Sequence, residues 1–154
     1  MIADPTVFAV AFAAYFAAHQ VGDHWVQSSC QAASKGGTGR AARAACAKHV
    51  LSLTATKLLF LVPVVLLLGL SVHPLAAVAA LTVDGVSHYW ADRRTTLARL
   101  ADRLGLGSFY RLGSPRPGHD DNPTLGTGAY ALDQSWHIAF LFVGALITAI
   151  GGTA

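Results

Sequence analysis

The stretch VLSLTATKLLFLVPVVLLLGLSV, from Val50 to Val72, decides the fold class. It carries a single charged residue, Lys57, and it is longer than the about 20 apolar residues that a helix needs to cross a bilayer. Three further segments are apolar over comparable lengths, at roughly 6–26, 75–90 and 129–150, although the last two are short or interrupted by polar residues. The pattern predicts an all-α protein, a four-helix transmembrane bundle.

The composition agrees with this prediction. The chain has 154 residues, of which 53% are hydrophobic and 12% charged, whereas about a quarter of a soluble domain is charged. The first apolar segment follows MIADPTVF, which lacks the basic residues of a secretory signal peptide, so we expect it to be retained as a helix. We expect one membrane domain over residues 1–154.

The expected helices cover residues 6–27, 44–70, 74–104 and 130–151, with loops at 28–43 and 105–129. Pro74 suits the first turn of the third helix. Beyond the membrane this helix places Leu97, Leu100 and Leu104 on one face, which predicts an amphipathic extension on the inner membrane surface, ended by Gly105.

The basic residues give the orientation. Ten of the eleven Lys and Arg lie in two segments, 35–48 and 93–116, which follow the first and third helices. Four alternating helices place both segments on one side, and the positive-inside rule assigns that side to the cytoplasm and both termini to the extracytoplasmic side. The sequence thus predicts a multi-pass protein of the inner (cytoplasmic) membrane. Cys30 and Cys46 flank the first basic segment and are expected to be free thiols, because the cytoplasm is reducing.

Ionisable residues recur within the apolar segments. Acid and histidine are four residues apart in four pairs, His19 with Asp23, Asp84 with His88, His88 with Asp92, and Asp133 with His137. Such pairs share one face of a helix. At about 1.5 Å per residue, these groups and His49 fall within about 12 Å of the cytoplasmic helix ends. Four helices therefore place imidazoles and carboxylates in one layer.

Ionisable groups at membrane depth cost about 2.5–3.5 kcal/mol each, so they pair with one another or bind a ligand. Imidazole and carboxylate are ligands of Zn, Mn and Fe, and helix bundles build such sites from facing helices. We expect a divalent metal ion, with one or two ions per chain. The predicted metal ligands are His19, His49, His88, His137 and Asp84. The predicted catalytic residues are Asp23, Asp92, Asp133 and Gln134, as further ligands, orienting groups, general base or substrate contact.

Two other interpretations of this layer stay open, a structural polar network between helices and an ion or proton pathway. Lys57 also offers Asp84 an alternative role, as the partner of a buried ion pair. In the segment GHDDNP, His119, Asp120 and Asp121 either form a solvated turn with Asn122 and Pro123 or fold back to complete the site. His24 and His73 are expected to be exposed or interfacial.

The ordered motifs resemble a small bacterial and phage membrane-protein family, domain of unknown function 3307, in its actinobacterial or actinophage branch. The similar motifs are HQVGDHWVQ (His19 to Gln27) with the following Lys35, His49 in KHV, DGVSHYWADRR (Asp84 to Arg94) and DQSWH (Asp133 to His137). The resemblance implies an integral membrane protein and supplies no established activity. His24 departs from the family pattern, where an aromatic residue often follows the first acid. A looser similarity is to small membrane proteins described as metal-dependent hydrolases.

The leading hypothesis is a metal-dependent hydrolase that acts on a membrane-associated substrate, and the alternative is a non-enzymatic scaffold or partner-binding protein. The expected partners are the lipid bilayer, anionic lipid headgroups near the basic segments, and a second copy of the chain through Ala9, Ala13 and Ala17. Nucleic-acid binding is not expected, because the basic residues flank membrane helices without a base-reading motif.

Overall fold

The computed structural model of the chain describes residues 2–121 and 126–154 and is helical throughout its regular elements. The prediction of an all-α protein is therefore confirmed. In chain order the elements are α1 (Pro5–Val21), the π-helical turn η1 (Gly22–Val26), α2 (Ser29–Ser34), α3 (Gly39–Leu67), α4 (Pro74–Asp92), α5 (Thr95–Arg103), α6 (Gly107–Tyr110) and α7 (Thr127–Thr148).

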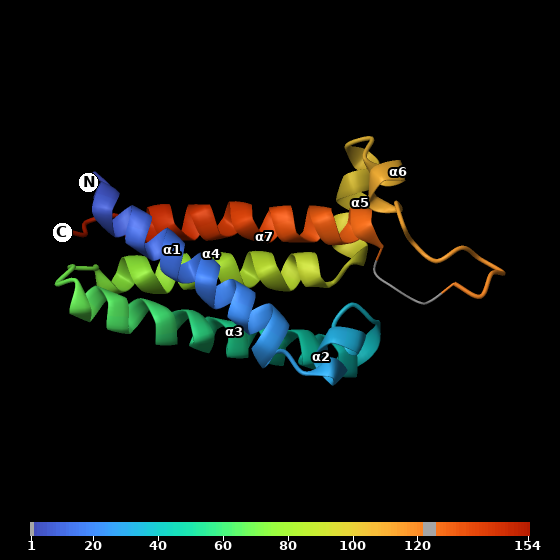
Figure 1. Cartoon of the computed structure of the whole chain (residues 1–154), viewed down its shortest axis with the longest axis horizontal. Coiled ribbons are helices and arrows are strands. Elements are labelled where there is room, and N and C mark those ends of the chain that lie inside the picture. Colours follow the sequence, from blue (N-terminus) through green and yellow to red (C-terminus); the bar gives the residue numbers. More distant parts are fainter. Residues whose placement is uncertain (1, 122–125) are drawn as a thin grey trace.

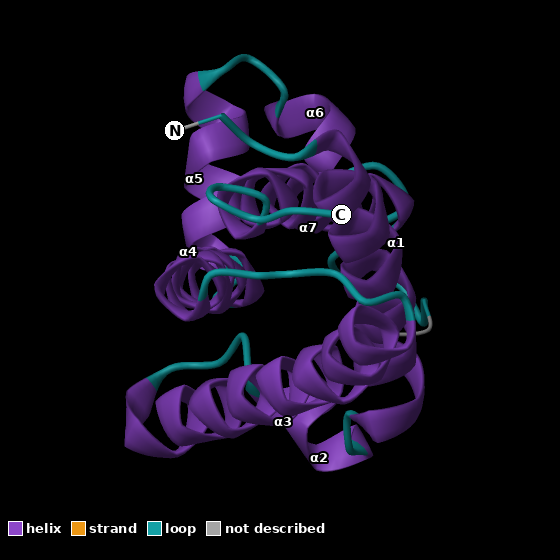
Figure 2. Cartoon of the chain, turned by 90° about the vertical axis from the view of Figure 1, so that its left-hand side faces the viewer, coloured by secondary structure: helices purple, strands orange, loops and turns teal. Residues whose placement is uncertain are grey.

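Four long helices, α1, α3, α4 and α7, lie side by side (Figure 1). Each contacts two others, in the order α1, α3, α4, α7 and back to α1, which is visible end-on in Figure 2. The short helices α2, α5 and α6 gather at one end of the molecule, and both chain ends lie at the other (Figure 1). The two basic segments thus share one end.

The end that carries the termini is held by backbone hydrogen bonds. The Asp4 N–H donates to the Ala149 carbonyl over 3.0 Å. Ser71, in the turn between α3 and α4, exchanges two hydrogen bonds of 2.8 and 3.0 Å with Thr153. This end is therefore fastened across α1, α7 and the α3–α4 turn.

Helix starts follow local sequence signals. The Asp4 carboxylate accepts hydrogen bonds of 2.9 Å from the Thr6 and Val7 amides, with Pro5 in the first turn of α1. Pro74 occupies the same position in α4, as predicted. A reciprocal capping box between Ser28 and Gln31 begins α2.

The predicted continuous helix 74–104 is wrong. The structure ends α4 at Asp92 and begins α5 at Thr95, with Arg94 between them at a φ of 54°. A positive φ is unusual for a residue with a side chain. The guanidinium groups of Arg93 and Arg94 donate hydrogen bonds to backbone carbonyls of residues 32–37, within and just after α2, and these bonds hold this turn. Residues 29–37 are called the α2 segment below. Gly105, at a φ of 76°, follows the end of α5 as predicted.

The predicted loops also contain helices. The segment 28–43 includes α2 and the first turn of α3, and the segment 105–129 includes α6 and the start of α7. These short elements lie at the end of the bundle where the ionisable layer was expected, so they form walls around it.

The polarity of the molecule is inverted relative to a water-soluble domain. Large apolar side chains on α3 are exposed, among them Leu59 at 70%, Leu66 at 74% and Leu67 at 83%. Ionisable side chains, such as His49 and Lys57, are buried instead. Helices α3 and α7 are long and apolar enough to cross a membrane, and only 22% and 28% of their most apolar windows is buried.

Small residues allow the long helices to approach closely. The apolar core consists of Ala11, Ala14, Tyr15, Leu61, Leu141 and Ala145. The opposite face of α1, with Ala9, Ala13 and Ala17, is exposed. Contact between two copies through this outer face stays a prediction.

Candidate metal centre

Seven of the ionisable residues predicted to form a layer lie together at the end of the bundle that carries the short helices. They are His19 of α1, Asp23 of η1, His49 of α3, His88 and Asp92 of α4, and Asp133 and His137 of α7. All four histidine side chains are at most 2% exposed. The sequence prediction of one polar layer is therefore confirmed for these residues.

The π-helical turn positions Asp23. The Gln27 N–H donates over 2.9 Å to the carbonyl of Gly22, five residues earlier in the chain. The turn after α1 therefore contains one residue more than an α-helical turn. Gly22 is also the point where α1 approaches α3, because a Cβ atom at Gly22 would lie 2.1 Å from Cδ1 of Leu53. The close approach brings the Asp23 carboxylate against His49, with 3.0 Å between Oδ1 and Nε2.

Four ligand atoms converge at the centre of the layer. The Nε2 atoms of His49 and His88 are 3.0 Å apart. Oδ1 of Asp23 lies 3.0 Å from the His49 Nε2 and 3.8 Å from the His88 Nε2. Oδ2 of Asp92 lies 3.4 and 3.2 Å from the same two nitrogens. Two groups of three have ligand atoms that all lie within 4.8 Å of one another, Asp23 with His49 and His88, and His88 with Asp92 and His137. They come from η1, α3, α4 and α7 and share His88.

This spacing fits a tetrahedral metal ion. Bonds of about 2.0–2.1 Å to four tetrahedral ligands place the ligand atoms roughly 3.3–3.4 Å apart. The five distances above range from 3.0 to 3.8 Å. The donor set of two nitrogens and two carboxylate oxygens suits Zn, Mn or Fe.

A second donor set adjoins the first through the other oxygens of the same carboxylates. Oδ2 of Asp23 lies 3.5 Å from Nε2 of His19, and Oδ1 of Asp92 lies 3.9 Å from Nε2 of His137. Oδ1 of Asp133 is 3.5 Å from the same His137 nitrogen. The Asp23 carboxylate therefore lies between His19 and His49, and the Asp92 carboxylate lies between His88 and His137.

Several of these atoms are buried without a hydrogen-bond partner among the described residues. They are Nε2 of His19, Nε2 of His137, Oδ1 of Asp23 and Oδ2 of Asp92. A buried polar atom without a partner is destabilising, so this concentration of such atoms indicates a ligand. The Nδ1 atoms of His49 and His88 also lack a protein partner, so the orientation of these rings depends on packing, including the stacking of His88 on His137 at 3.9 Å.

The structure separates Asp84 from the other predicted ligands. Its carboxylate accepts a hydrogen bond from the ammonium of Lys57, and both side chains are buried. The pairing expected for Lys57 is confirmed. The prediction of Asp84 as a metal ligand is corrected, because the buried Lys57 charge already satisfies it.

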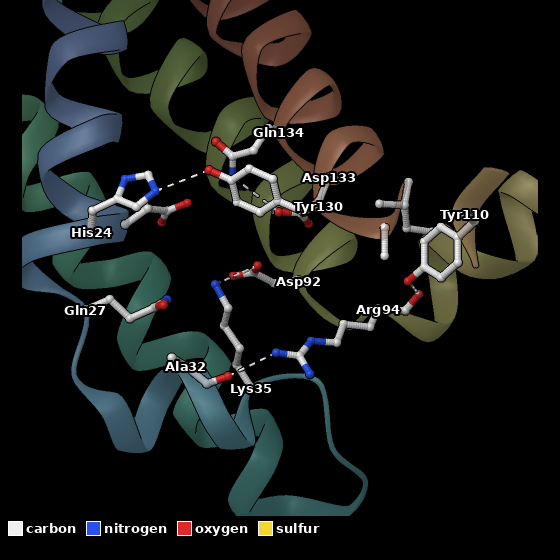
Figure 3. A pocket seen from close by; sticks show the side chains of 13 residues that line it. His24, Gln27, Ala32, Lys35, Asp92, Arg94, Tyr110, Tyr130, Asp133 and Gln134 are labelled. Atoms are coloured by element: carbon white, nitrogen blue, oxygen red, sulfur yellow. Dashed lines mark hydrogen bonds and ion pairs between the residues drawn. The ribbon is translucent and has the colours of Figure 1, made fainter. Parts of the chain in front are cut away.

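A polar pocket of about 180 Å³ opens directly onto the carboxylates of the centre (Figure 3). Gln134 lines it, as does Asp133, to which the Gln134 amide donates over 3.4 Å. Lys35, Arg94 and Tyr110 also line it, and sequence reasoning did not assign them to the site. For Lys35 the sequence offered one indication of a role, its position after the HQVGDHWVQ motif that resembles the family pattern. The pocket is lined by Asp23, His24, Gln27, Ala32, Lys35, Asp92, Arg94, Leu97, Tyr110, Ala129, Tyr130, Asp133 and Gln134.

The α2 segment forms one wall of this pocket and is held by two arginines. Arg93 donates to the carbonyl of Lys35 over 2.5 Å and also to the carbonyl of Gly37. Arg94 donates to the carbonyl of Ala32 over 3.1 Å. These bonds fix Lys35 with its ammonium 2.8 Å from Oδ1 of Asp92 (Figure 3).

The opposite wall contains two tyrosines. Tyr110 of α6 donates its hydroxyl to the Arg94 carbonyl over 3.3 Å, and burial raises the pKa of this hydroxyl. The hydroxyl of Tyr130 lies 3.5 Å from Nε2 of His24 across the pocket mouth (Figure 3). His24, which was expected to be exposed or interfacial, is exposed and lines the mouth of this pocket.

The histidine and acids of the 105–129 segment lie elsewhere. Asp121 pairs with Arg116 over 3.0 Å, and hydrogen bonds from Arg116 lower the pKa of the Asp121 carboxyl. His119 and Asp120 are exposed, and Asn122 and Pro123 of the expected turn lie outside the described residues. The described part of this segment therefore adds no ligand to the centre. Both cysteines are free, as predicted, with Cys30 exposed and Cys46 buried.

Comparison with known proteins adds no relative. No protein-family model, curated protein or solved structure matches the chain. The resemblance to domain of unknown function 3307 stays a prediction, and the function must be argued from the site.

Proposed function

We propose that this chain is an integral membrane, metal-dependent hydrolase whose centre lies near the cytoplasmic face. The observation that carries the proposal is the position of one carboxylate oxygen each of Asp23 and Asp92 against the Nε2 atoms of His49 and His88, at distances of 3.0–3.8 Å. Transmembrane insertion of all four long helices as one bundle, with both termini outside, is part of the proposal. Exposed leucines around buried ionisable groups support it.

In this proposal His49, His88, Asp23 and Asp92 would hold one divalent ion, and His19 and His137 would contribute to a second. A bound divalent ion supplies Lewis acidity and acidifies water. Asp133 is the cluster carboxylate with the most exposed side chain, at 17%, and it lines the pocket. It is therefore the group that accepts the proton of the attacking water.

Three other residues act on the substrate in this proposal. The Gln134 amide faces the pocket and donates to a substrate oxygen. The Lys35 ammonium balances the charge of Asp92 and presents a cation to the pocket. Gln27 adds a buried amide nitrogen without a hydrogen-bond partner among the described residues.

The two other interpretations are less well supported. In a purely structural network the polar atoms would hydrogen-bond one another, whereas several of these atoms, although close to charged groups, make no hydrogen bond among the described residues. For an ion pathway the layer would have to continue through the bundle. Beyond the Lys57–Asp84 pair, however, the interior is filled by the Ala11, Tyr15, Leu61, Leu141 and Ala145 side chains.

Metal analysis of the detergent-purified full chain tests the proposal. We expect one or two equivalents of Zn, Mn or Fe after purification without chelators, and metal-dependent hydrolysis of p-nitrophenyl phosphate. His49→Ala and His88→Ala should lose the metal, while His73→Ala, exposed at the opposite end, should keep it. A folded protein without stoichiometric metal would refute the proposal.

A further inference from the structure

We propose that the substrate is a phospholipid with a phosphate monoester headgroup, held with its phosphate in the polar pocket and an acyl chain in the adjoining apolar groove. This inference rests on the proposed function. The two features are a small polar cavity over the metal centre and an apolar groove beside it, and Leu97 lines both.

The size of the polar pocket limits what it can take. Its volume is about 180 Å³, below the about 300–1,000 Å³ of pockets that enclose a whole drug-sized ligand. A small polar group therefore fits inside while the remainder of the molecule lies outside. The pocket floor is formed by Asp23, Asp92 and Asp133, so this group contacts the metal centre.

The charge of the pocket depends on metal. Lys35 and Arg94 oppose three carboxylates, which leaves the pocket with a formal charge of −1. One divalent ion reverses this charge to +1, and a second raises it further. The loaded pocket thus attracts an anion, and Lys35, Arg94 and the unpartnered Gln27 amide supply donors that suit phosphate oxygens.

The apolar groove lies on the other side of Leu97. It has a volume of about 260 Å³ and lies between α5 and the adjoining part of α7. Its walls include Leu100, Leu104, Leu132 and Trp136. Helix α5, which forms one side of the groove, also carries two exposed cations, Arg99 and Arg103, and such cations attract anionic lipids. A groove that continues from an anion pocket and is lined with leucine matches an acyl chain.

The reaction follows from this placement. A water oxygen bonds to phosphorus, and the P–O bond to the lipid alcohol breaks. Asp133 takes a proton from the water and then donates this proton to the leaving alkoxide, so Asp133 ends the cycle as a carboxylate. The products are inorganic phosphate and a neutral lipid alcohol, which stays in the membrane.

Quenching of Trp136 fluorescence tests the binding mode, because Trp136 lines the groove. The full chain with Trp25→Phe and Trp90→Phe, metal-loaded in detergent, is titrated with phosphatidate that carries brominated acyl chains. We expect saturable quenching, and at least tenfold weaker quenching by brominated phosphatidylcholine at the same mole fraction. Removal of metal should abolish the preference for phosphatidate. Inorganic phosphate, which lacks a chain, should not quench and should compete only weakly.

Matched variants separate pocket, groove and surface charge. Lys35→Met should weaken phosphatidate binding at least tenfold, while Lys48→Met, which removes an exposed cation of α3 outside both the pocket and the groove, should not. Leu132→Gln, in the groove alone, should reduce quenching without changing the metal content. Equal quenching by the two lipids, or equal effects of the two cation variants, would overturn the inference.

The same samples distinguish the two proposals. Metal content and hydrolysis of p-nitrophenyl phosphate report on the proposed function and do not require a lipid. A protein that binds metal and hydrolyses this soluble ester but shows no preference for phosphatidate retains the proposed function and refutes only the lipid inference. A protein that binds no metal refutes the proposed function, and a preference for phosphatidate shown by that metal-free protein would also contradict the metal-dependent binding inferred here.

Discussion

The ammonium of Lys35 lies 2.8 Å from one carboxylate oxygen of Asp92, whose other oxygen faces the Nε2 atoms of His49 and His88. Asp92 thus contacts the imidazoles of the candidate metal centre directly, whereas Lys35 contacts only Asp92 among the charged groups of the cluster. In the proposed centre Asp92 would provide a ligand atom, whereas Lys35 provides a charge to the pocket.

Asp92→Asn should lower metal affinity by at least tenfold, because an amide is a weaker ligand and Lys35 then carries an unbalanced charge toward the ion. Lys35→Met should retain the metal, because both oxygens of Asp92 remain, and should lower hydrolysis. Competition with a chromogenic chelator measures the affinities. Asp102→Asn is the control, because Asp102 pairs with Arg111 on the exposed surface. Equal metal affinity in Asp92→Asn and Asp102→Asn would exclude Asp92 as a ligand.

The buried Lys57–Asp84 pair offers a second test. Lys57→Met should destabilise the protein by about 3–5 kcal/mol, because it leaves the Asp84 carboxylate buried without its partner. The double variant Lys57→Met/Asp84→Leu should recover most of this loss. Unfolding in detergent measures the stability, and metal analysis of the double variant should give the unchanged stoichiometry. Loss of metal in the double variant would show that Asp84 is needed for metal binding, as the sequence analysis had predicted.

Gly22 tests the approach of α1 to α3. Gly22→Ala should destabilise the chain by about 1–3 kcal/mol and lower metal affinity, because the new Cβ displaces Leu53 and with it the Asp23 turn. Gly85→Ala is the matched control, since the nearest atom to its Cβ would be Val50 Cγ1 at 3.4 Å, an ordinary contact. Thermal unfolding and metal content should therefore separate the two variants, and indistinguishable behaviour would argue against a tight α1–α3 contact.

The thiol of Cys30 tests the orientation in the membrane. Cys30 is exposed at the end with the basic segments, and Cys46 is buried. A membrane-impermeant maleimide should label Cys30 in inverted vesicles and leave it unlabelled in spheroplasts. Cys30→Ser/Ser71→Cys, with the thiol in the exposed turn at the opposite end, should reverse the pattern. Labelling of both positions from the same side would refute the four-span topology.

The ionisable layer was predictable because helical periodicity is a local property. The spacing of His19 with Asp23 and of Asp133 with His137 places each pair on one face, and burial of polar groups requires those faces to meet. The same reasoning could not separate Asp84 from the ligands. That outcome depends on Lys57 of another helix, which lies against Asp84 only after α3 and α4 have packed.

The walls of the pocket were not predictable from helix patterns. The break at Arg94 depends on guanidinium bonds to the carbonyls of Ala32, Lys35 and Gly37, which are distant in sequence. Periodicity favours a continuous helix there, since Leu97 and Leu100 continue the apolar face. The long-range bonds to α2 override that local preference and bring Lys35 to Asp92.

The backbone hydrogen bonds that join Asp4 to Ala149 and Ser71 to Thr153 lie at the end of the bundle opposite the metal centre. They hold α1, α7 and the α3–α4 turn together at that end, whereas α2, α5 and α6 contribute to the walls of the pocket at the other end. The ligand histidines and carboxylates lie on the tethered helices or on the turn that ends α1. Exchange of the wall segments would therefore change which molecules enter while the metal ligands keep their places, which makes this architecture a suitable scaffold for altering substrate range.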